Sequence, residues 1–183
     1  MKLFQKIKGW TLAIRLRLHG HHVGRGLTSA KWNPFACSLS SKRRISIGDN
    51  VHFGKNLSIW VKHGAELMLD DKVVFTGDSY IRAAKSIRFG ECCSLGEFFS
   101  IRDSNHGTVI GSDILSQPSE HAPIVIGRDV WIGAGSRILM GATIPDGCVI
   151  GANSTVLRSS PLEPNGIYGG SPVKLLKFRQ AKQ

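Results

Sequence analysis

The chain lacks several features that would place it in other classes of protein. None of its apolar runs approaches the roughly 20 residues that a helix needs to cross a bilayer. Its N-terminus has no uninterrupted apolar segment followed by a small-residue cleavage site, since charges recur at Lys6, Lys8, Arg15 and Arg17. We therefore expect neither a membrane-spanning protein nor a secreted one, and the predicted location is the cytoplasm.

Cysteine is scarce, and its spacing does not suit a metal site. The 183 residues contain four cysteines, Cys37, Cys92, Cys93 and Cys148, and no C-x-x-C pair. Structural zinc sites are built from such closely spaced thiolates, so we expect no metal. Cys148 occupies a position where a repeat described below requires a small residue, and this predicts a buried thiol.

Acidic residues are absent from residues 1–44, which carry ten of the 24 lysines and arginines. The net charge of +11 therefore leaves only +1 for the rest of the chain. The basicity belongs to an N-terminal arm, which we assign to residues 1–44. This arm contains no recognised nucleic-acid-binding motif and the remainder is nearly neutral, so a nucleic acid partner is not expected.

The arm begins with a sequence typical of an amphipathic helix. Six large apolar residues fall on one side of that helix, with the basic residues on its flanks and back. These six are Leu3, Phe4, Ile7, Trp10, Ile14 and Leu18. Two interpretations remain open: residues 1–20 contact an anionic membrane at its interface, or the helix packs on the open end of the domain that follows. One helix could do both.

A six-residue repeat is the most informative feature of the chain. From residue 126 onward every sixth residue is aliphatic, and the fifth residue of each unit is small, except for Val130. The aliphatic positions are Ile126, Ile132, Ile138, Ile144, Ile150 and Val156. A unit of one short strand and one tight corner buries almost nothing alone, so such repeats are stable only when successive coils stack. The pattern predicts an all-β solenoid.

The same period appears upstream with slips, and one segment interrupts it. It runs through Ile47, Phe53 and Ile59, then Leu69, Phe75 and Ile81, then Phe89, Leu95 and Ile101. Residues 105–123 break the period with a polar stretch that contains His106 and His121, which predicts a loop ejected from the solenoid. We therefore assign residues 45–161 to the solenoid and residues 162–183 to a C-terminal tail.

Three segments together resemble the hexapeptide-repeat acyltransferases, especially bacterial O-acetyltransferases of sugars and polysaccharides. These are the hexads, the stretch from Val130 to Ala134, and the ending from Gly169 to Lys174, in which Val173 replaces the family's usual alanine. The resemblance covers roughly residues 45–178. It implies a left-handed parallel β-helix, a homotrimer, acetyl-CoA as acetyl donor, and active sites in clefts between subunits.

The resemblance also implies a catalytic base. A sugar hydroxyl must lose its proton as it attacks a thioester, and an imidazole that titrates near neutrality suits this task. His106, at the start of the ejected loop, matches the catalytic histidine of galactoside and maltose acetyltransferases. Asp103 is a candidate to orient His106 or to bind the acceptor, and Asn105 and His121 are candidate acceptor contacts. In the irregular first half, Thr76, Asp78 and Tyr80 are weaker candidates to face the cleft of a neighbouring subunit.

Five further residues match the donor side of the family. By resemblance the backbone N–H of Ala134 stabilises the oxyanion, Ala152 holds the pantetheine arm, and Trp131 walls the acetyl pocket. Arg158 and Lys174 occupy positions similar to those that bind the phosphates of coenzyme A.

The resemblance favours acetyl-CoA-dependent O-acetylation of a surface glycan, such as a capsule, lipopolysaccharide or exopolysaccharide precursor. The alternatives are N-acetylation of a nucleotide sugar or another small acceptor and, less favoured, a non-enzymatic scaffold. A zinc hydratase on the same solenoid needs three convergent histidines, and the region from His106 to His121 lacks the close histidine pair of that class.

Overall fold

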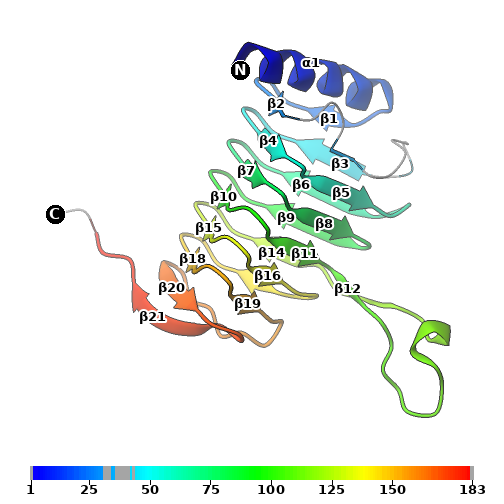
Figure 1. Cartoon of the computed structure of the whole chain (residues 1–183), viewed down its shortest axis with the longest axis vertical. Coiled ribbons are helices and arrows are strands. Elements are labelled where there is room, and N and C mark those ends of the chain that lie inside the picture. The colour runs from blue at the N-terminus through cyan, green and yellow to red at the C-terminus, as the bar shows by residue number, and fades with distance from the viewer. Residues whose placement is uncertain (1, 31–33, 36–41, 43, 182–183) are drawn as a thin grey trace.

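The protein is a parallel β-helix in which each complete coil contributes one strand to each of three sheets (Figure 1). The structure, a computed structural model, describes residues 2–30, 34–35, 42 and 44–181. Cys37 lies outside these residues. Helix α1 (Lys2–Leu18) lies across one end of the stack of coils, and the C-terminal strands form the opposite end. The predicted all-β solenoid is confirmed.

The strands are short, and neighbours in each of the three sheets belong to successive coils. Sheet A contains, in order, β1 (His22–Val23), β3 (Arg44–Ile47), β6 (Glu66–Leu69), β9 (Ser86–Phe89), β14 (Ile124–Ile126) and β17 (Thr143–Ile144). Sheet B contains β2 (Thr28–Ser29), β4 (His52–Lys55), β7 (Val74–Gly77), β10 (Ser94–Leu95), β15 (Trp131–Ile132), β18 (Val149–Ile150), β20 (Gly166–Gly169) and β21 (Lys174–Phe178). Sheet C contains β5 (Ser58–Val61), β8 (Tyr80–Ala83), β11 (Ser100–Arg102), β16 (Arg137–Ile138) and β19 (Thr155–Val156). The ejected loop adds β12 (Ser104–Asn105), β13 (Glu120–His121) and the 3₁₀ turn η1 (Ile114–Ser116).

The aliphatic residues of the hexads form the core, as predicted. In sheet C, for example, Ile81 pairs with Ile101 and Ile101 with Ile138, and all three side chains are fully buried. The slips upstream arise because the early coils are longer. Leu69 follows its partner Ile47 by 22 residues, whereas the later coils repeat every 18. The wider early coils are filled by phenylalanine: the ring of Phe75 lies 5.4 to 5.9 Å, centre to centre, from three others.

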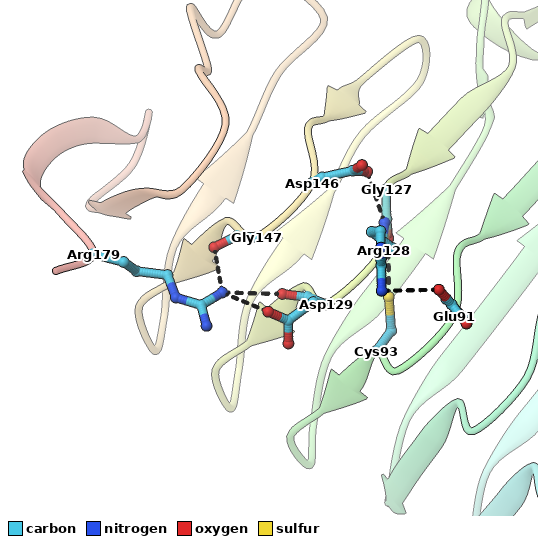
Figure 2. Close-up of polar contacts among 8 residues, drawn as sticks. All are labelled: Glu91, Cys93, Gly127, Arg128, Asp129, Asp146, Gly147 and Arg179. Carbon is cyan, nitrogen blue, oxygen red and sulfur yellow. Dashed lines mark hydrogen bonds and ion pairs between the residues drawn. The ribbon is translucent and has the colours of Figure 1, made fainter. Parts of the chain in front are cut away.

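The β-helix extends beyond the predicted boundaries at both ends. β1 and β2 pair in parallel with β3 and β4, so the first coil begins inside the segment assigned to the basic arm. At the other end β20 continues sheet B in parallel, and β21 then turns back antiparallel to it. Figure 2 shows Arg179, just beyond β21, donating to the Asp129 carboxylate at 2.8 Å and to the Gly147 carbonyl at 2.9 Å, which ties the tail to the coils.

Helix α1 caps the first coil with a face that the apolar pattern did not predict. Leu12 and Leu16 are fully buried, and Ala13 and Gly9 lie beside them. A Cβ added at Gly9 would collide with the Leu27 carbonyl, so glycine allows the helix to lie directly on the backbone of the coil. The six large apolar residues grouped in the sequence are instead exposed to solvent. Within the described residues no helix combines the length and apolarity of a membrane span.

Candidate active site

The ejected loop leaves the β-helix at the end of β11 and returns at β14 (Figure 1). An antiparallel pair closes its base, with Ser104 opposite His121 and Asn105 opposite Glu120. His106 follows directly and is exposed, as is Asn105. The loop thus begins with a short two-stranded stem, and His106 follows it beyond the edge of sheet C. The ejected loop predicted from the sequence is present at this place.

Gln117, a residue that sequence reasoning did not single out, braces the interior of the loop. Its amide oxygen accepts from the Val109 N–H at 2.8 Å, and its amide nitrogen donates to the carbonyls of Val109 and Ser112 at 3.0 and 2.9 Å. These contacts cross-link the loop from within, so its tip has a defined shape although Ile110 is fully exposed.

Asp103 has a different place from the one suggested by its position near His106. It is fully buried, and its two carboxylate oxygens accept from the backbone N–H groups of Ala84, Lys85 and Ser86 at 2.6 to 2.8 Å. The carboxylate therefore holds the corner between β8 and β9, in the preceding coil. Because its oxygens face that corner, Asp103 supports the base of the loop instead of orienting the imidazole or meeting an acceptor. No sequence signal indicated this role.

His121 lies at the foot of the stem, across from Ser104. Its side chain is half-buried, and Nδ1 is buried with no hydrogen-bond partner among the described residues. Although His121 is at the end of the loop in sequence, it therefore lies close to the start of the loop in space. Its role as an acceptor contact stays a prediction.

The weaker candidates lie on the earlier coils, away from the loop tip. Thr76 donates to the Leu95 carbonyl at 3.0 Å, and Asp78 accepts from the side chain of Asn56 at 2.7 Å. Tyr80 lies on β8, level with Ser100 of β11. Thr76 and Asp78 thus serve contacts between coils, and only Tyr80 approaches the strand that leads to His106.

Ala134 and Ala152 occupy the same corner in successive coils, between sheets B and C. Neither backbone N–H has an acceptor among the described residues. A Cβ added at Gly133 would lie 2.6 Å from the Ala152 nitrogen, so glycine at this corner allows the coils to stack closely. The corner therefore presents two free N–H donors on a surface of small side chains, which suits an oxyanion and a slender ligand arm.

Trp131 and Lys174 lie toward this corner, whereas Arg158 lies beside Gly141 at the opposite edge of sheet C, the edge from which the loop leaves. Trp131 points outward from β15, between Ser94 and Val149, with 56% of its surface exposed. Arg158 follows β19 and Lys174 begins β21; both are exposed and neither forms an ion pair within the described residues. All the predicted donor residues thus lie on the later coils, toward the C-terminal end.

His106, the predicted base, and the predicted donor corner formed by Ala134 and Ala152 lie at opposite edges of sheet C. Ala134 precedes β16, whereas His106 follows β11, the strand beside β16. About five extended residues separate the two edges, roughly 15 Å. His106 therefore cannot meet the N–H of Ala134 in its own chain, and a site using both requires a second copy.

Comparison with known proteins identifies the family. Residues 123–158 match the family described as bacterial transferase hexapeptide, six repeats. WbbJ of Escherichia coli K12, named as a lipopolysaccharide biosynthesis O-acetyl transferase, is 30% identical over 151 residues, covering 78% of this chain and 76% of WbbJ. The chain belongs to the hexapeptide-repeat acetyltransferases. A protein of Mycobacterium tuberculosis named as an acetyltransferase is also 30% identical, over 95% of this chain but 57% of its own length.

Solved structures of an N-acyltransferase and of a hexapeptide-repeat acetyltransferase share the fold. AntD, an N-acyltransferase from Bacillus cereus in complex with dTDP-4-amino-4,6-dideoxyglucose and coenzyme A, superposes with a TM-score of 0.63 at 19% identity, over 92% of this chain and 89% of AntD. An acetyltransferase from Vibrio cholerae complexed with acetyl-CoA gives 0.59 at 22% identity, over 98% and 89% of the two chains. These likenesses confirm the left-handed parallel β-helix predicted for the chain.

This hexapeptide-repeat acetyltransferase carries a ladder of arginine and aromatic side chains that sequence reasoning missed. On the outer surface of sheet C, Arg82 lies between Trp60 and Arg102 in register. The Arg82 guanidinium lies 4.3 Å from the centre of the Trp60 ring, and that of Arg102 lies 5.8 Å from the Tyr80 ring. Neither arginine forms an ion pair within the described residues. The ladder places positive charge and aromatic rings on neighbouring strands of sheet C, ending at Arg102 beside the stem that precedes His106.

The thiols of this acetyltransferase are built into its corners. Cys93 donates to the Gly127 carbonyl at 3.1 Å (Figure 2), and burial raises its pKa to about 11. Cys148 is buried as predicted, donates to the Glu163 carbonyl at 3.2 Å, and has its pKa raised by the same desolvation. Both therefore stay protonated near neutrality and are poor nucleophiles. Among the described residues no three His, Cys, Asp or Glu side chains converge as metal ligands.

Proposed function

We propose that this protein is an acetyl-CoA-dependent O-acetyltransferase that modifies a sugar hydroxyl of a surface-glycan precursor in the cytoplasm. The observation that carries the proposal is that sheet C has exposed His106 at one edge and the N–H of Ala134, which has no acceptor among the described residues, at the other. The relationship to WbbJ, which extends over most of both chains, supports a glycan as the acceptor.

In the proposed reaction His106 takes the proton of the acceptor hydroxyl as the hydroxyl oxygen attacks the thioester carbonyl carbon. The carbonyl oxygen becomes negatively charged in the tetrahedral intermediate and accepts a hydrogen bond from the N–H of Ala134. The C–S bond then breaks, the acetyl ester remains on the sugar, and the coenzyme A thiolate takes the proton back from the imidazolium.

Two copies of the chain share each such site, and we propose a homotrimer with three of them. One edge of sheet C would supply His106, and the opposite edge of a neighbour would supply the donor corner. The two edges differ, so the contact is heterologous, and in the proposed trimer three such contacts close into a ring. The loop leaves the stack between the coils of β11 and β14, and Ala134 lies in the coil of β14, so the copies must stand side by side at the same height.

The remaining candidate residues have roles in binding. Ala152 offers a flat corner for the pantetheine arm and Trp131 a wall for the acetyl group, while Arg158 and Lys174 meet the phosphates of coenzyme A. On the acceptor side, Asn105 and His121 lie at the stem beside His106. The Arg102 guanidinium favours an acceptor that carries a negative charge or a face that stacks on aromatic rings.

N-acetylation of an amino sugar is the alternative, because an N-acyltransferase shares this fold. A neutral amine attacks a thioester without prior deprotonation, so it depends less on a base than a hydroxyl does. Parallel assays with a sugar and the matching amino sugar distinguish the two reactions: the alternative holds if only the amine is acetylated.

The test compares His106→Ala with His63→Ala, a matched control at an exposed histidine in an early coil. We expect His106→Ala to lower kcat about 10²- to 10⁴-fold, the usual contribution of a general base. Acetyl-CoA binding by calorimetry should be unchanged, and His63→Ala should behave as wild type in both assays. Retained turnover in His106→Ala would refute the role of His106 as general base. Absence of acetyl-CoA binding by the folded wild type would refute acetyl-CoA as the acetyl donor.

A further inference from the structure

Helix α1 has two apolar faces, and only one is used in the fold. The inner face, centred on Leu12 and Leu16, is buried on the first coil. The opposite side, which we call the outer face of α1, consists of Leu3, Phe4, Ile7, Trp10, Ile14 and Leu18. Leu3, Phe4 and Trp10 are about two-thirds exposed and Leu18 is 79% exposed. Six neighbouring large apolar side chains in water are typical of a surface that meets a partner.

Basic side chains lie between the two faces on both flanks of the helix. At 100° per residue, Lys6 and Arg17 fall on one flank and Lys8 and Arg15 on the other. Lys8 and Arg17 are also tied to the first coil, through the carbonyls of Ala30 at 3.2 Å and Val23 at 2.6 Å respectively. The outer face is therefore an apolar stripe bordered by cations, in a segment of 44 residues without an acidic group.

A cavity of about 640 Å³ opens where one flank meets the first coil. Trp10 and Leu27 form part of its apolar lining, and Lys6, Arg17 and Arg25 bring three cations to it. An anionic headgroup has room there beside the apolar stripe.

We propose that the outer face of α1 docks this protein on an anionic membrane surface. Leu, Phe and Trp enter the boundary between headgroups and acyl chains, while the flanking cations meet lipid phosphates. A second copy of the cap is a poorer partner, because two such faces bring many positive charges together. The Phe and Leu stripe gains nothing from the phosphate backbone of a nucleic acid.

The position of the cap makes this docking multivalent, a step that rests on the trimer of the proposed function. Figure 1 shows α1 across the end of the coil stack. The side chains of its outer face are exposed, whereas those of the inner face are buried against the coils. Copies that stand side by side at the same height present all their outer faces in one plane, so each helix raises the effective concentration of the others. The coil of β11 lies three strand spacings, roughly 15 Å, from the first coil on the side away from α1. When α1 is docked, His106 is therefore held off the membrane surface but within reach of a lipid-linked glycan.

The test is sedimentation of the full-length protein with phosphatidylcholine vesicles, with and without phosphatidylglycerol, at low and high salt. We expect the wild type to bind the anionic vesicles, and high salt to weaken that binding. Phe4→Ser/Trp10→Ser should lower the partition coefficient at least tenfold, because two large apolar side chains no longer leave water. Lys6→Glu/Arg15→Glu should abolish the preference for anionic lipid.

The matched control is Val109→Ser/Ile110→Ser, which removes two exposed apolar side chains from the loop tip instead. This variant should bind vesicles as wild type does, and loss of its binding would move the docking surface to the loop. Thermal unfolding should be unchanged in Phe4→Ser/Trp10→Ser, since both side chains are already exposed. A double variant that binds vesicles normally overturns the proposal. The proposal is also overturned if the wild type forms a larger oligomer without lipid and the double variant does not. In that case the outer faces bind each other.

Vesicle binding requires neither acetyl-CoA nor His106, so this proposal and the proposed activity fail separately. A protein that binds anionic vesicles but transfers no acetyl group keeps the docking surface and loses the enzyme. One that acetylates soluble sugars but ignores vesicles does the reverse.

Discussion

Sharing of the site between copies can be tested by complementation of two inactive variants. His106→Ala removes the base and leaves the donor corner intact. Ala152→Trp leaves the base intact and places a large side chain across the proposed pantetheine path; Ala152 is exposed, so the indole can be accommodated without disturbing the core. We expect homotrimers of His106→Ala to lose about 10²- to 10⁴-fold in activity, and those of Ala152→Trp to lose acetyl-CoA binding.

The expected recovery follows from the arrangement of sheet C. A mixed trimer has two copies of one variant and one of the other, and therefore three heterologous interfaces. Only one of these joins an intact His106 to an intact donor corner, so mixed trimers should show about one third of wild-type activity. If each chain served itself, no chain would hold both groups and mixing would restore nothing. A dimer with two shared sites would recover about half.

The assay uses co-expression with two different affinity tags, tandem purification of mixed assemblies, and measurement of coenzyme A release in the presence of an acceptor sugar. Two copies of His106→Ala that differ only in their tags serve as the control and should stay inactive. Mixed assemblies no more active than their parents would refute the shared site, and with it the reason for proposing the trimer.

Three further predictions concern the cap, the loop stem and the thiols. Leu16→Ala should destabilise the protein by about 2–5 kcal/mol, because a fully buried side chain of the inner face of α1 is lost; a melting temperature unchanged by calorimetry would contradict that packing. Asp103→Asn should lower the free energy of unfolding by about 1–3 kcal/mol, since an amide cannot accept from all three N–H donors. The pH profile of kcat/KM should be unchanged in the folded variant. A shifted profile would show that Asp103 acts on His106. At pH 8 a thiol reagent should modify exposed Cys92 but spare Cys93, whose pKa is raised to about 11, as mapped by peptide mass spectrometry; modification of both at similar rates would show that the corner opens.

Much of the fold could be predicted because the spacing of the repeat indicates which side chains point into the core. One aliphatic residue in six implies coils in which that side chain points inward, and Ile101 and Ile138 stack as this requires. The interruption after Asn105 likewise predicted a loop, since a segment without the period has nothing to add to the core. These conclusions depend on local spacing alone, which a sequence displays directly.

The candidate site could be predicted only in part. The resemblance pointed to His106 and Ala134 as a pair, but it is the tertiary structure that separates them across sheet C. Asp103 illustrates a second limit. Its partners are backbone groups of Ala84, Lys85 and Ser86 in the preceding coil. Backbone donors have no residue type that a sequence pattern can reveal.

By itself the sequence determined that the N-terminal helix would be apolar and basic, but not which side would face inward. Hydrophobicity favours the outer face, which has the larger side chains. Only the tertiary structure decided otherwise, because Gly9 lets the helix axis approach the Leu27 carbonyl closely and Leu12 and Leu16 are then buried beside it. Close approach of two backbones selects small residues, and the bulky apolar side chains are left exposed on the opposite side.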